Sequence, residues 1–153
     1  MNTSVKRSSI ALIIYDKKLL LFLRDNYRSI TDPNTWSLVG GEVDKGETHK
    51  QAIVREMNEE INIAPKKIRY LGRIQTQDGN LHAIFLVNPT LEEVKKIKLG
   101  NEGQKVEFFR FNEIIRLDLA RNVRNYFNAY SSYLEGIINS GKATNTEKLG
   151  LTL

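Results

Sequence analysis

Two apolar runs near the start of the chain limit the folds that it can adopt. They are "SSIALIIY" at residues 8–15 and "LLLFLR" at residues 19–24, separated by the polar turn "DKK". Both runs have the length of strands, but neither alternates between apolar and polar residues. A strand that is apolar on both faces needs a layer packed against each of them. The runs therefore predict two strands of a sheet that is buried between helices.

The middle of the chain adds further strands and two helices. "WSLV" at residues 36–39 is a short apolar segment that leads into the Gly40-Gly41 turn, and strands are predicted on both sides of "QDGN", which is a hairpin signal at residues 77–80. A helix is predicted at residues 48–61, where Thr48 and Gln51 have the spacing of a capping box. Thr90 and Glu93 have the same spacing and predict a second, short helix. Alternating strands and helices of this kind indicate a mixed α/β fold.

The C-terminal third is predicted to contain one strand and two helices. "KVEFFRF" at residues 105–111 has the composition of a strand, and a brief helical pattern follows at residues 112–117. A longer helix is expected at residues 119–139, with Gly141 as its stop. We interpret residues 1–141 as a single domain and expect residues 142–153 to form a flexible tail.

The composition restricts the partners and the kind of metal. The net charge of +5 favours anionic partners such as nucleotides. The chain has no cysteine, so any metal must be held by oxygen atoms or by His49 and His82. Such ligands favour Mg²⁺ or Mn²⁺. No apolar run approaches the roughly 18 residues of a membrane span, and the first residues lack a signal-peptide cleavage site. We therefore expect a cytoplasmic protein that does not insert into membranes.

The acidic stretch from Gly40 to Ile63 carries the strongest functional signal. A helical wheel places the core face of the predicted helix at Ile53, Val54, Met57 and Ile61. The neighbouring arc holds three glutamates around Ala52, namely Glu56, Glu59 and Glu60. Like charges one turn apart repel, and a bound hard cation would offset that repulsion. The ordinary alternative is a solvated acidic face, but it does not account for the preceding glycine turn and Glu47.

This stretch resembles the Nudix box. That motif runs Gly, five residues, Glu, seven residues, Arg-Glu, an aliphatic residue, any residue, Glu-Glu, any residue, Gly and an aliphatic residue. The matching positions are Gly41, Glu47, Arg55, Glu56, Met57, Glu59, Glu60 and Ile63. The closing glycine is replaced by Asn62, which is the next best residue for a left-handed helix end. Val39 stands where a proline is often found. The order of the elements resembles the family over most of residues 8–137.

The resemblance implies an α/β/α sandwich with a central mixed β-sheet, in which residues 1–141 form one Nudix hydrolase domain. It implies a metal-dependent pyrophosphohydrolase, with Mg²⁺ or Mn²⁺, that cleaves a nucleoside diphosphate linked to another moiety. The substrate would be a nucleoside triphosphate or a nucleotide sugar. The resemblance assigns Glu56, Glu60, the Gly41 carbonyl and Glu59 to the metal. Arg55 would orient a carboxylate, and Glu47 would tie the loop to the helix.

The resemblance also suggests the groups that act on the substrate. Either Glu59 or Glu102 would accept the proton of the attacking water, although Glu102 also fits an ordinary loop acid. Arg24 at the end of the second strand is a candidate for contacting phosphate, with a surface ion pair as the alternative. Trp36 is a candidate for stacking on a base, with a place in the core as the alternative. The two histidines fit surface or packing positions, although His82 could also face the substrate.

Three other functions compete with hydrolysis. A Nudix-like domain can bind a nucleotide without cleaving it, but such domains typically lose the acids that this chain keeps. Specific nucleic-acid binding is not expected, because lysine and arginine are dispersed among acids and no recognition motif is visible. An isomerase on the same scaffold would need a cysteine. The sequence leaves the oligomeric state open, a homodimer included.

Overall fold

The computed structural model describes residues 5–76 and 79–153. Its strands are β1 (Arg7–Tyr15), β2 (Lys18–Leu23), β3 (Trp36–Ser37), β4 (Val39–Glu42), β5 (Ile68–Gln75), β6 (Leu81–Val87) and β7 (Lys105–Phe109). Its helices are α1 (His49–Ile61), α2 (Leu91–Lys95), α3 (Phe111–Ile114), α4 (Arg121–Ala129), α5 (Ser131–Ser140) and the 3₁₀ helix η1 (Thr146–Leu149). The predicted turn at residues 77–80 lies partly outside the described residues.

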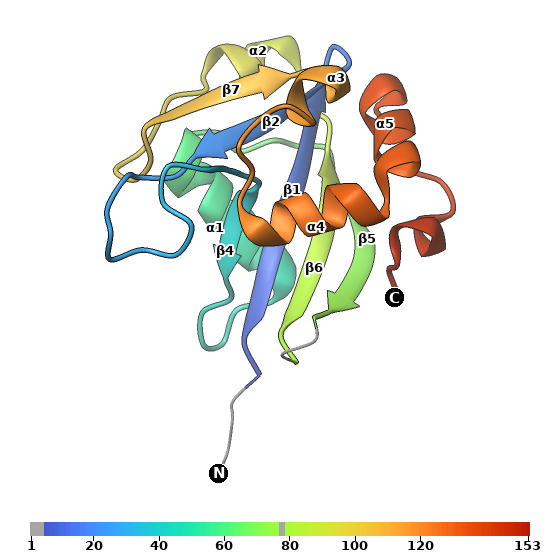
Figure 1. The fold of residues 1–153 in the computed structure, drawn as a ribbon, viewed down its shortest axis with the longest axis horizontal. Helices are drawn as coiled ribbons and strands as arrows, with labels where there is room; N and C mark the ends of the chain where they lie inside the picture. Colours follow the sequence, from blue (N-terminus) through green and yellow to red (C-terminus); the bar gives the residue numbers. More distant parts are fainter. Residues whose placement is uncertain (1–4, 77–78) are drawn as a thin grey trace.

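β1 is the centre of a mixed sheet (Figure 1). It pairs in parallel with β6 on one side, and antiparallel with both β2 and β4 on the other. β5 continues the sheet beyond β6, while β3 and β7 pair with β2. The register places Gly41 opposite Ser9 and Gly40 opposite Ile10. The glycine turn is therefore a paired strand whose far end leads directly into the loop before α1.

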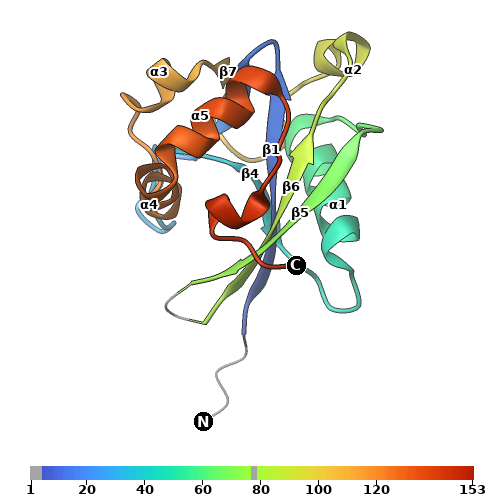
Figure 2. The ribbon, with the colours of Figure 1, turned by 90° about the vertical axis from the view of Figure 1, so that its right-hand side faces the viewer.

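The sheet separates α4 and α5 on one face from α1 on the other (Figure 2), and an apolar layer lies on each side. Leu12 and Ile14 of β1 belong to the layer under α4 and α5, whereas Ala11 and Ile13 face the layer under α1. β2 and β6 divide their side chains between the two layers in the same alternating way. Both faces of these strands are thus buried, which explains the continuous apolar runs. The predicted α/β/α sandwich with a central mixed sheet is confirmed.

The C-terminal third differs from the prediction in two ways. The expected long helix is interrupted at Tyr130 (φ −127°, ψ 30°), so that α4 and α5 are separate helices. Residues 142–153 were expected to form a flexible tail. They pack against the domain instead, because Ala143, Leu149 and Leu151 are buried in the core. The Thr152 backbone also exchanges two hydrogen bonds with Arg73 of β5. Residues 142–153 therefore extend the layer that contains α4 and α5.

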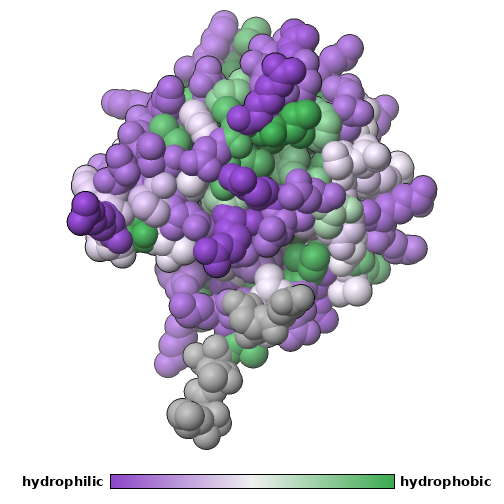
Figure 3. Space-filling view, viewed as in Figure 1, coloured by the Kyte–Doolittle hydropathy of each residue, from purple (hydrophilic) through white to green (hydrophobic). Residues whose placement is uncertain are grey.

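The face that carries α4 and α5 is largely hydrophilic, with apolar side chains gathered in its upper half (Figure 3). Ile115, Leu117 and Leu119 line a hollow between α3 and α4 on this side. Within the described residues, no helix combines the length and the apolar character needed to cross a membrane.

Candidate active site

The start of α1 is fixed by its N-terminal cap, and its orientation is fixed by the side chains that it buries. The capping box is confirmed: the Thr48 hydroxyl accepts the Gln51 N–H at 3.1 Å, and the Gln51 side chain accepts the Thr48 N–H at 2.8 Å. Ile53, Met57 and Ile61 are fully buried, as predicted, and so is Ala52. Val54 was wrongly assigned to the core and is 37% exposed. The buried stripe therefore extends toward the glutamate arc and not away from it.

Arg55 ties this helix to the loop before it. Its Nε and Nη2 atoms donate to the two carboxylate oxygens of Glu47, at 2.8 and 3.0 Å, which is the paired geometry expected for arginine. Nη2 also donates to the Glu42 carbonyl at 3.0 Å, and Nη1 donates to Glu56 at 2.9 Å. The hydrogen bond from Arg55 holds the pKa of Glu47 below its usual value, and it raises the pKa of Arg55. Glu47 therefore stays ionised and fixes the loop.

Glu56 and Glu60 form a carboxylate pair against the glycine turn. Glu60 accepts the Gly40 N–H at 3.0 Å, and the side chain of Glu56 is only 15% exposed. The pKa of Glu60 is raised to about 8, mainly by burial and in part by the neighbouring Glu56 and Glu102. A Cβ atom at Gly41 would lie 2.5 Å from Glu56 Oε1, so a larger residue there would force the Glu56 carboxylate to move. The pair thus places two carboxyl groups side by side at a partly dehydrated spot, where ionisation of both is unfavourable without a cation.

The pair has the chemistry of a hard-cation site, with fewer side chains than predicted. Glu59 lies on the outer side of the helix, where it accepts a 3.3 Å hydrogen bond from Arg55 and is 58% exposed. No group of three or more histidine, aspartate or glutamate side chains in residues 5–76 and 79–153 is arranged to hold a metal ion. Mg²⁺ often takes one or two carboxylates and completes its shell with waters and substrate phosphates. The Glu56–Glu60 pair fits a cation bound in that way.

Glu102 lies on the loop that faces this pair. Its side chain is exposed, and its charge contributes to the raised pKa of Glu60. The same loop touches the helix, since Gly100 N–H donates to the Glu60 carbonyl at 2.9 Å. The structure therefore brings a third carboxylate near Glu56 and Glu60 from a segment that lies forty residues further along the chain.

Arg24 and Trp36 lie at the ends of the paired strands β2 and β3. Arg24 Nε donates to the Thr31 carbonyl at 3.0 Å, so its guanidinium closes the loop after β2. Trp36 is 8% exposed and meets the Phe109 ring edge-on, with ring centres 4.8 Å apart. The Lys105 ammonium lies 5.6 Å from the centre of the indole ring. This placement favours packing over base stacking for Trp36.

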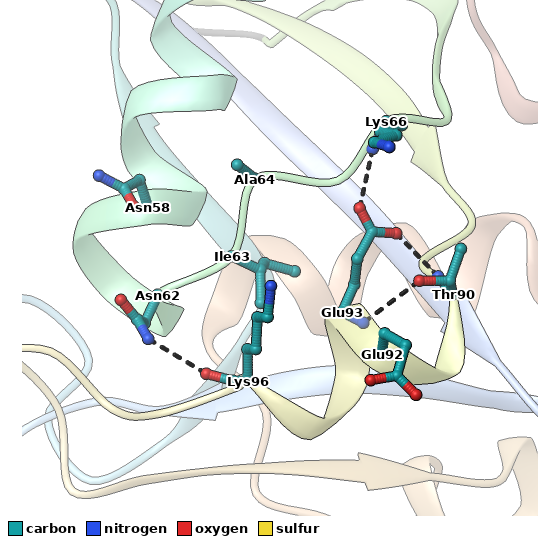
Figure 4. A pocket seen from close by; sticks show the side chains of 9 residues that line it. All are labelled: Asn58, Asn62, Ile63, Ala64, Lys66, Thr90, Glu92, Glu93 and Lys96. Atoms are coloured by element: carbon teal, nitrogen blue, oxygen red, sulfur yellow. Dashed lines mark hydrogen bonds between the residues drawn. The ribbon is translucent and has the colours of Figure 1, made fainter.

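Asn62, which replaces the closing glycine of the Nudix box, ends α1 as expected. It adopts the left-handed conformation (φ 61°, ψ 35°). Its side-chain amide also donates to the Lys96 carbonyl at 3.2 Å, which glycine could not do (Figure 4). This hydrogen bond lies in a hollow between α1 and α2, where Glu93 accepts the N–H groups of Lys66 and Thr90. The replacement thus links the end of α1 to the segment that leads to Glu102.

Sequence reasoning missed several contacts that shape the site. The donation from Gly40 to Glu60 was not anticipated, although the paired glycines were a signal for a close backbone approach. Asp25 accepts the Gly103 N–H at 3.1 Å, and this partner is distant in the sequence and belongs to no motif. His49 was expected to be a surface or packing residue. It packs beside the buried Ser9, whose hydroxyl donates to the His49 carbonyl at 2.7 Å.

Comparisons with known proteins agree with the fold and the helix. The NUDIX domain family model matches residues 5–130. An ADP-ribose pyrophosphatase of Methanocaldococcus jannaschii is 30% identical over 123 residues, which cover 75% of this chain and 69% of the relative. An 8-oxo-dGTP diphosphatase of Escherichia coli is 29% identical over 105 residues, covering 68% of this chain and 81% of the relative. The crystal structure of a MutT protein from Methanosarcina mazei superposes with a TM-score of 0.67 at 22% identity, covering 86% and 96% of the two chains.

Proposed function

Because this chain belongs to the Nudix family, whose members hydrolyse phosphoanhydride bonds, we propose that it is a metal-dependent pyrophosphohydrolase. Its substrate would be a nucleoside diphosphate linked to another moiety, of the nucleoside triphosphate or nucleotide sugar type. The names of the two relatives put ADP-ribose and oxidised deoxynucleoside triphosphates first among the substrates to test. The net charge of +5 supports a polyanionic substrate.

The observation that carries the proposal is the Glu56–Glu60 pair beside Gly40 and Gly41. These carboxylates would hold Mg²⁺ or Mn²⁺, with the Gly41 carbonyl as a further ligand and Glu59 as a candidate ligand from the outer side. When bound, such a cation neutralises the diphosphate and lowers the pKa of a coordinated water. Arg55 contributes by fixing Glu56 on the helix and Glu47 on the loop, so the two sides of the site keep one geometry.

The remaining candidates would act on the substrate itself. Glu102 faces the pair from a loop and is exposed, so it can accept the proton of the attacking water. Glu59 is the alternative acceptor, because it is exposed on the same helix one residue from Glu60. Arg24 would contact a phosphate through its Nη1 and Nη2 groups, since its Nε donates to the Thr31 carbonyl. Trp36 would contribute by supporting β3 from the core, since its ring is covered.

The test is hydrolysis of a nucleotide panel that contains ADP-ribose, 8-oxo-dGTP and a nucleotide sugar, with millimolar Mg²⁺ or Mn²⁺. Products would be identified by chromatography, beside Glu60→Gln and the matched control Glu135→Gln on α5. We expect Glu60→Gln to lower kcat by at least about 100-fold and the control to match the wild type. Turnover should also stop when a chelator removes the cation.

A different result would point to the alternative of a sensing domain. Tight binding of a nucleotide without turnover, unchanged by Glu60→Gln, would refute the hydrolase. The carboxylate pair would then need another explanation. Turnover that persists in the chelator would instead refute the metal dependence while leaving the hydrolase intact.

A further inference from the structure

The loop that carries Glu102 is anchored at its beginning to the C-terminal end of α1. Lys98 N–H donates to the Ile61 carbonyl at 3.1 Å, and Gly100 N–H donates to the Glu60 carbonyl at 2.9 Å. A Cβ atom at Gly100 would collide with the Glu59 carbonyl oxygen. The chain therefore passes directly over the helix turn that bears Glu59 and Glu60, and only glycine permits this approach.

The loop is anchored at its other end to the C-terminal end of β2. Asp25 Oδ2 accepts the Gly103 N–H at 3.1 Å. Gly103 has a φ of 88°, and a Cβ atom there would collide with the Phe22 ring. Gln104 continues the attachment, because its N–H donates to the Leu23 carbonyl and its side-chain amide donates to the Arg24 carbonyl at 2.8 Å.

Only residues 101 and 102 lie between the two anchors. A segment this short has little freedom when both ends are fixed, because each residue has only two soft backbone dihedrals. The anchor on α1 is made by backbone atoms of the carboxylate helix. The anchor on β2 is the one that depends on a side chain outside the Nudix box, since Asp25 supplies the acceptor for Gly103.

We propose that Asp25 is a positioning residue that holds Glu102 in front of the Glu56–Glu60 pair. The inference rests on the proposed hydrolase function and assigns the proton acceptor to Glu102 instead of Glu59. The side chain of Asp25 acts on the loop, through its hydrogen bond with Gly103. Its effect on catalysis passes through the backbone of Gly103 to the neighbouring Glu102.

The experiment combines kinetics with amide hydrogen exchange on the full chain. The variants are Asp25→Ala, Asp25→Asn, Glu102→Gln and the double variant Asp25→Ala/Glu102→Gln. The control is Glu113→Ala, which removes a 2.9 Å hydrogen bond of the same kind, to the Arg110 N–H, at the opposite end of β7. Asp25→Asn keeps an oxygen that can accept the Gly103 N–H, so it serves as the conservative rescue.

We expect Asp25→Ala to lower kcat by about 10- to 100-fold, because small displacements of a catalytic group are costly. KM should change by less than about 3-fold, since Glu102 is not assigned to binding. Asp25→Asn should retain most of the activity. In the Glu102→Gln background, Asp25→Ala should lower kcat by less than about 2-fold, because the two side chains act as one unit. The Gly103 amide should exchange faster in Asp25→Ala than in the wild type. In Glu113→Ala its exchange rate should not change.

Two results would overturn the inference without touching the hydrolase. One is equal loss of kcat from Asp25→Ala in both backgrounds, and the other is full activity of Glu102→Gln while Glu60→Gln is inactive. Failure of the proposed function looks different, because no substrate is then turned over by the wild type. Unchanged Gly103 exchange in Asp25→Ala would overturn the anchoring itself, whatever the activity.

Discussion

The raised pKa of Glu60 predicts an unusual pH dependence of stability in the metal-free protein. Burial raises this pKa from 4.5 to about 8, so the folded protein keeps a proton that the unfolded chain releases. The stabilisation is complete below the unfolded pKa of about 4.5 and is lost as the pH rises toward about 8. Within that range the free energy of unfolding should fall by up to about 1.4 kcal/mol per pH unit.

The other shifted groups allow Glu60 to be isolated by choice of pH. The lowered pKa of Glu47 gives stability that is lost in acid, and the lowered pKa of His49 gives stability that is complete above its usual value. The Glu47 contribution is constant above about pH 6.5, and what remains of the His49 contribution is at most about 0.4 kcal/mol and rises with pH, opposite to the loss from Glu60. Between about pH 6.5 and 8 the loss attributable to Glu60 should therefore reach about 2 kcal/mol.

Urea unfolding in the presence of a chelator measures this loss. Trp36 is the only tryptophan of the chain and is buried, so its fluorescence reports unfolding. The free energy of unfolding would be obtained by linear extrapolation at several pH values. Glu60→Gln should remove most of the slope, because a neutral amide carries no proton to lose. Stability that is flat across this range, or an equal slope in the variant, would refute the reasoning.

Three further changes test other parts of the site and the fold. Arg55→Lys should lower kcat and cost about 1–3 kcal/mol of stability, because lysine cannot make the paired contact with Glu47; kinetics and urea unfolding measure both. Gly41→Ala should weaken Mg²⁺ binding at least several-fold, since its Cβ would lie 2.5 Å from a Glu56 oxygen; calorimetry measures the affinity, and an unchanged value would contradict the role of the turn. Deletion of residues 142–153 should cost about 3 kcal/mol or more, because three buried apolar side chains leave the core; an unchanged unfolding midpoint would contradict this.

The central sheet was predictable because its signal is local. The runs in β1 and β2 are apolar at every position, and only burial on both faces explains such a pattern. The start and end of α1 were also predictable, since the Thr48–Gln51 hydrogen bonds and the bond from the Asn62 backbone N–H to the Asn58 carbonyl are local. In both cases the residues that decide the structure are neighbours in the sequence.

The errors arose where distant contacts decide the structure. No glycine or proline marks the interruption at Tyr130, whose hydroxyl packs so close to Gly150 that a Cβ atom there would collide with it. The final segment looked polar, but Leu149 and Leu151 fill space left by α4 and α5. Val54 was assigned to the core by spacing alone, whereas the sheet lies nearer the Ala52 side of the helix. Each of these outcomes depends on a partner that one sequence cannot identify.

The carboxylates of the acidic stretch are held in two opposite ways. In the described part of the chain, the ion pairs of Arg55 are with Asp44, Glu47, Glu56 and Glu59. Glu60 instead accepts a hydrogen bond from the Gly40 N–H. Burial raises the pKa of Glu60, whereas the hydrogen bond from Arg55 lowers the pKa of Glu47. A carboxylate that the protein leaves uncompensated is a candidate for function. Glu60 can thus give up its proton when a cation binds, as a cation site between the protein and a polyanionic substrate requires.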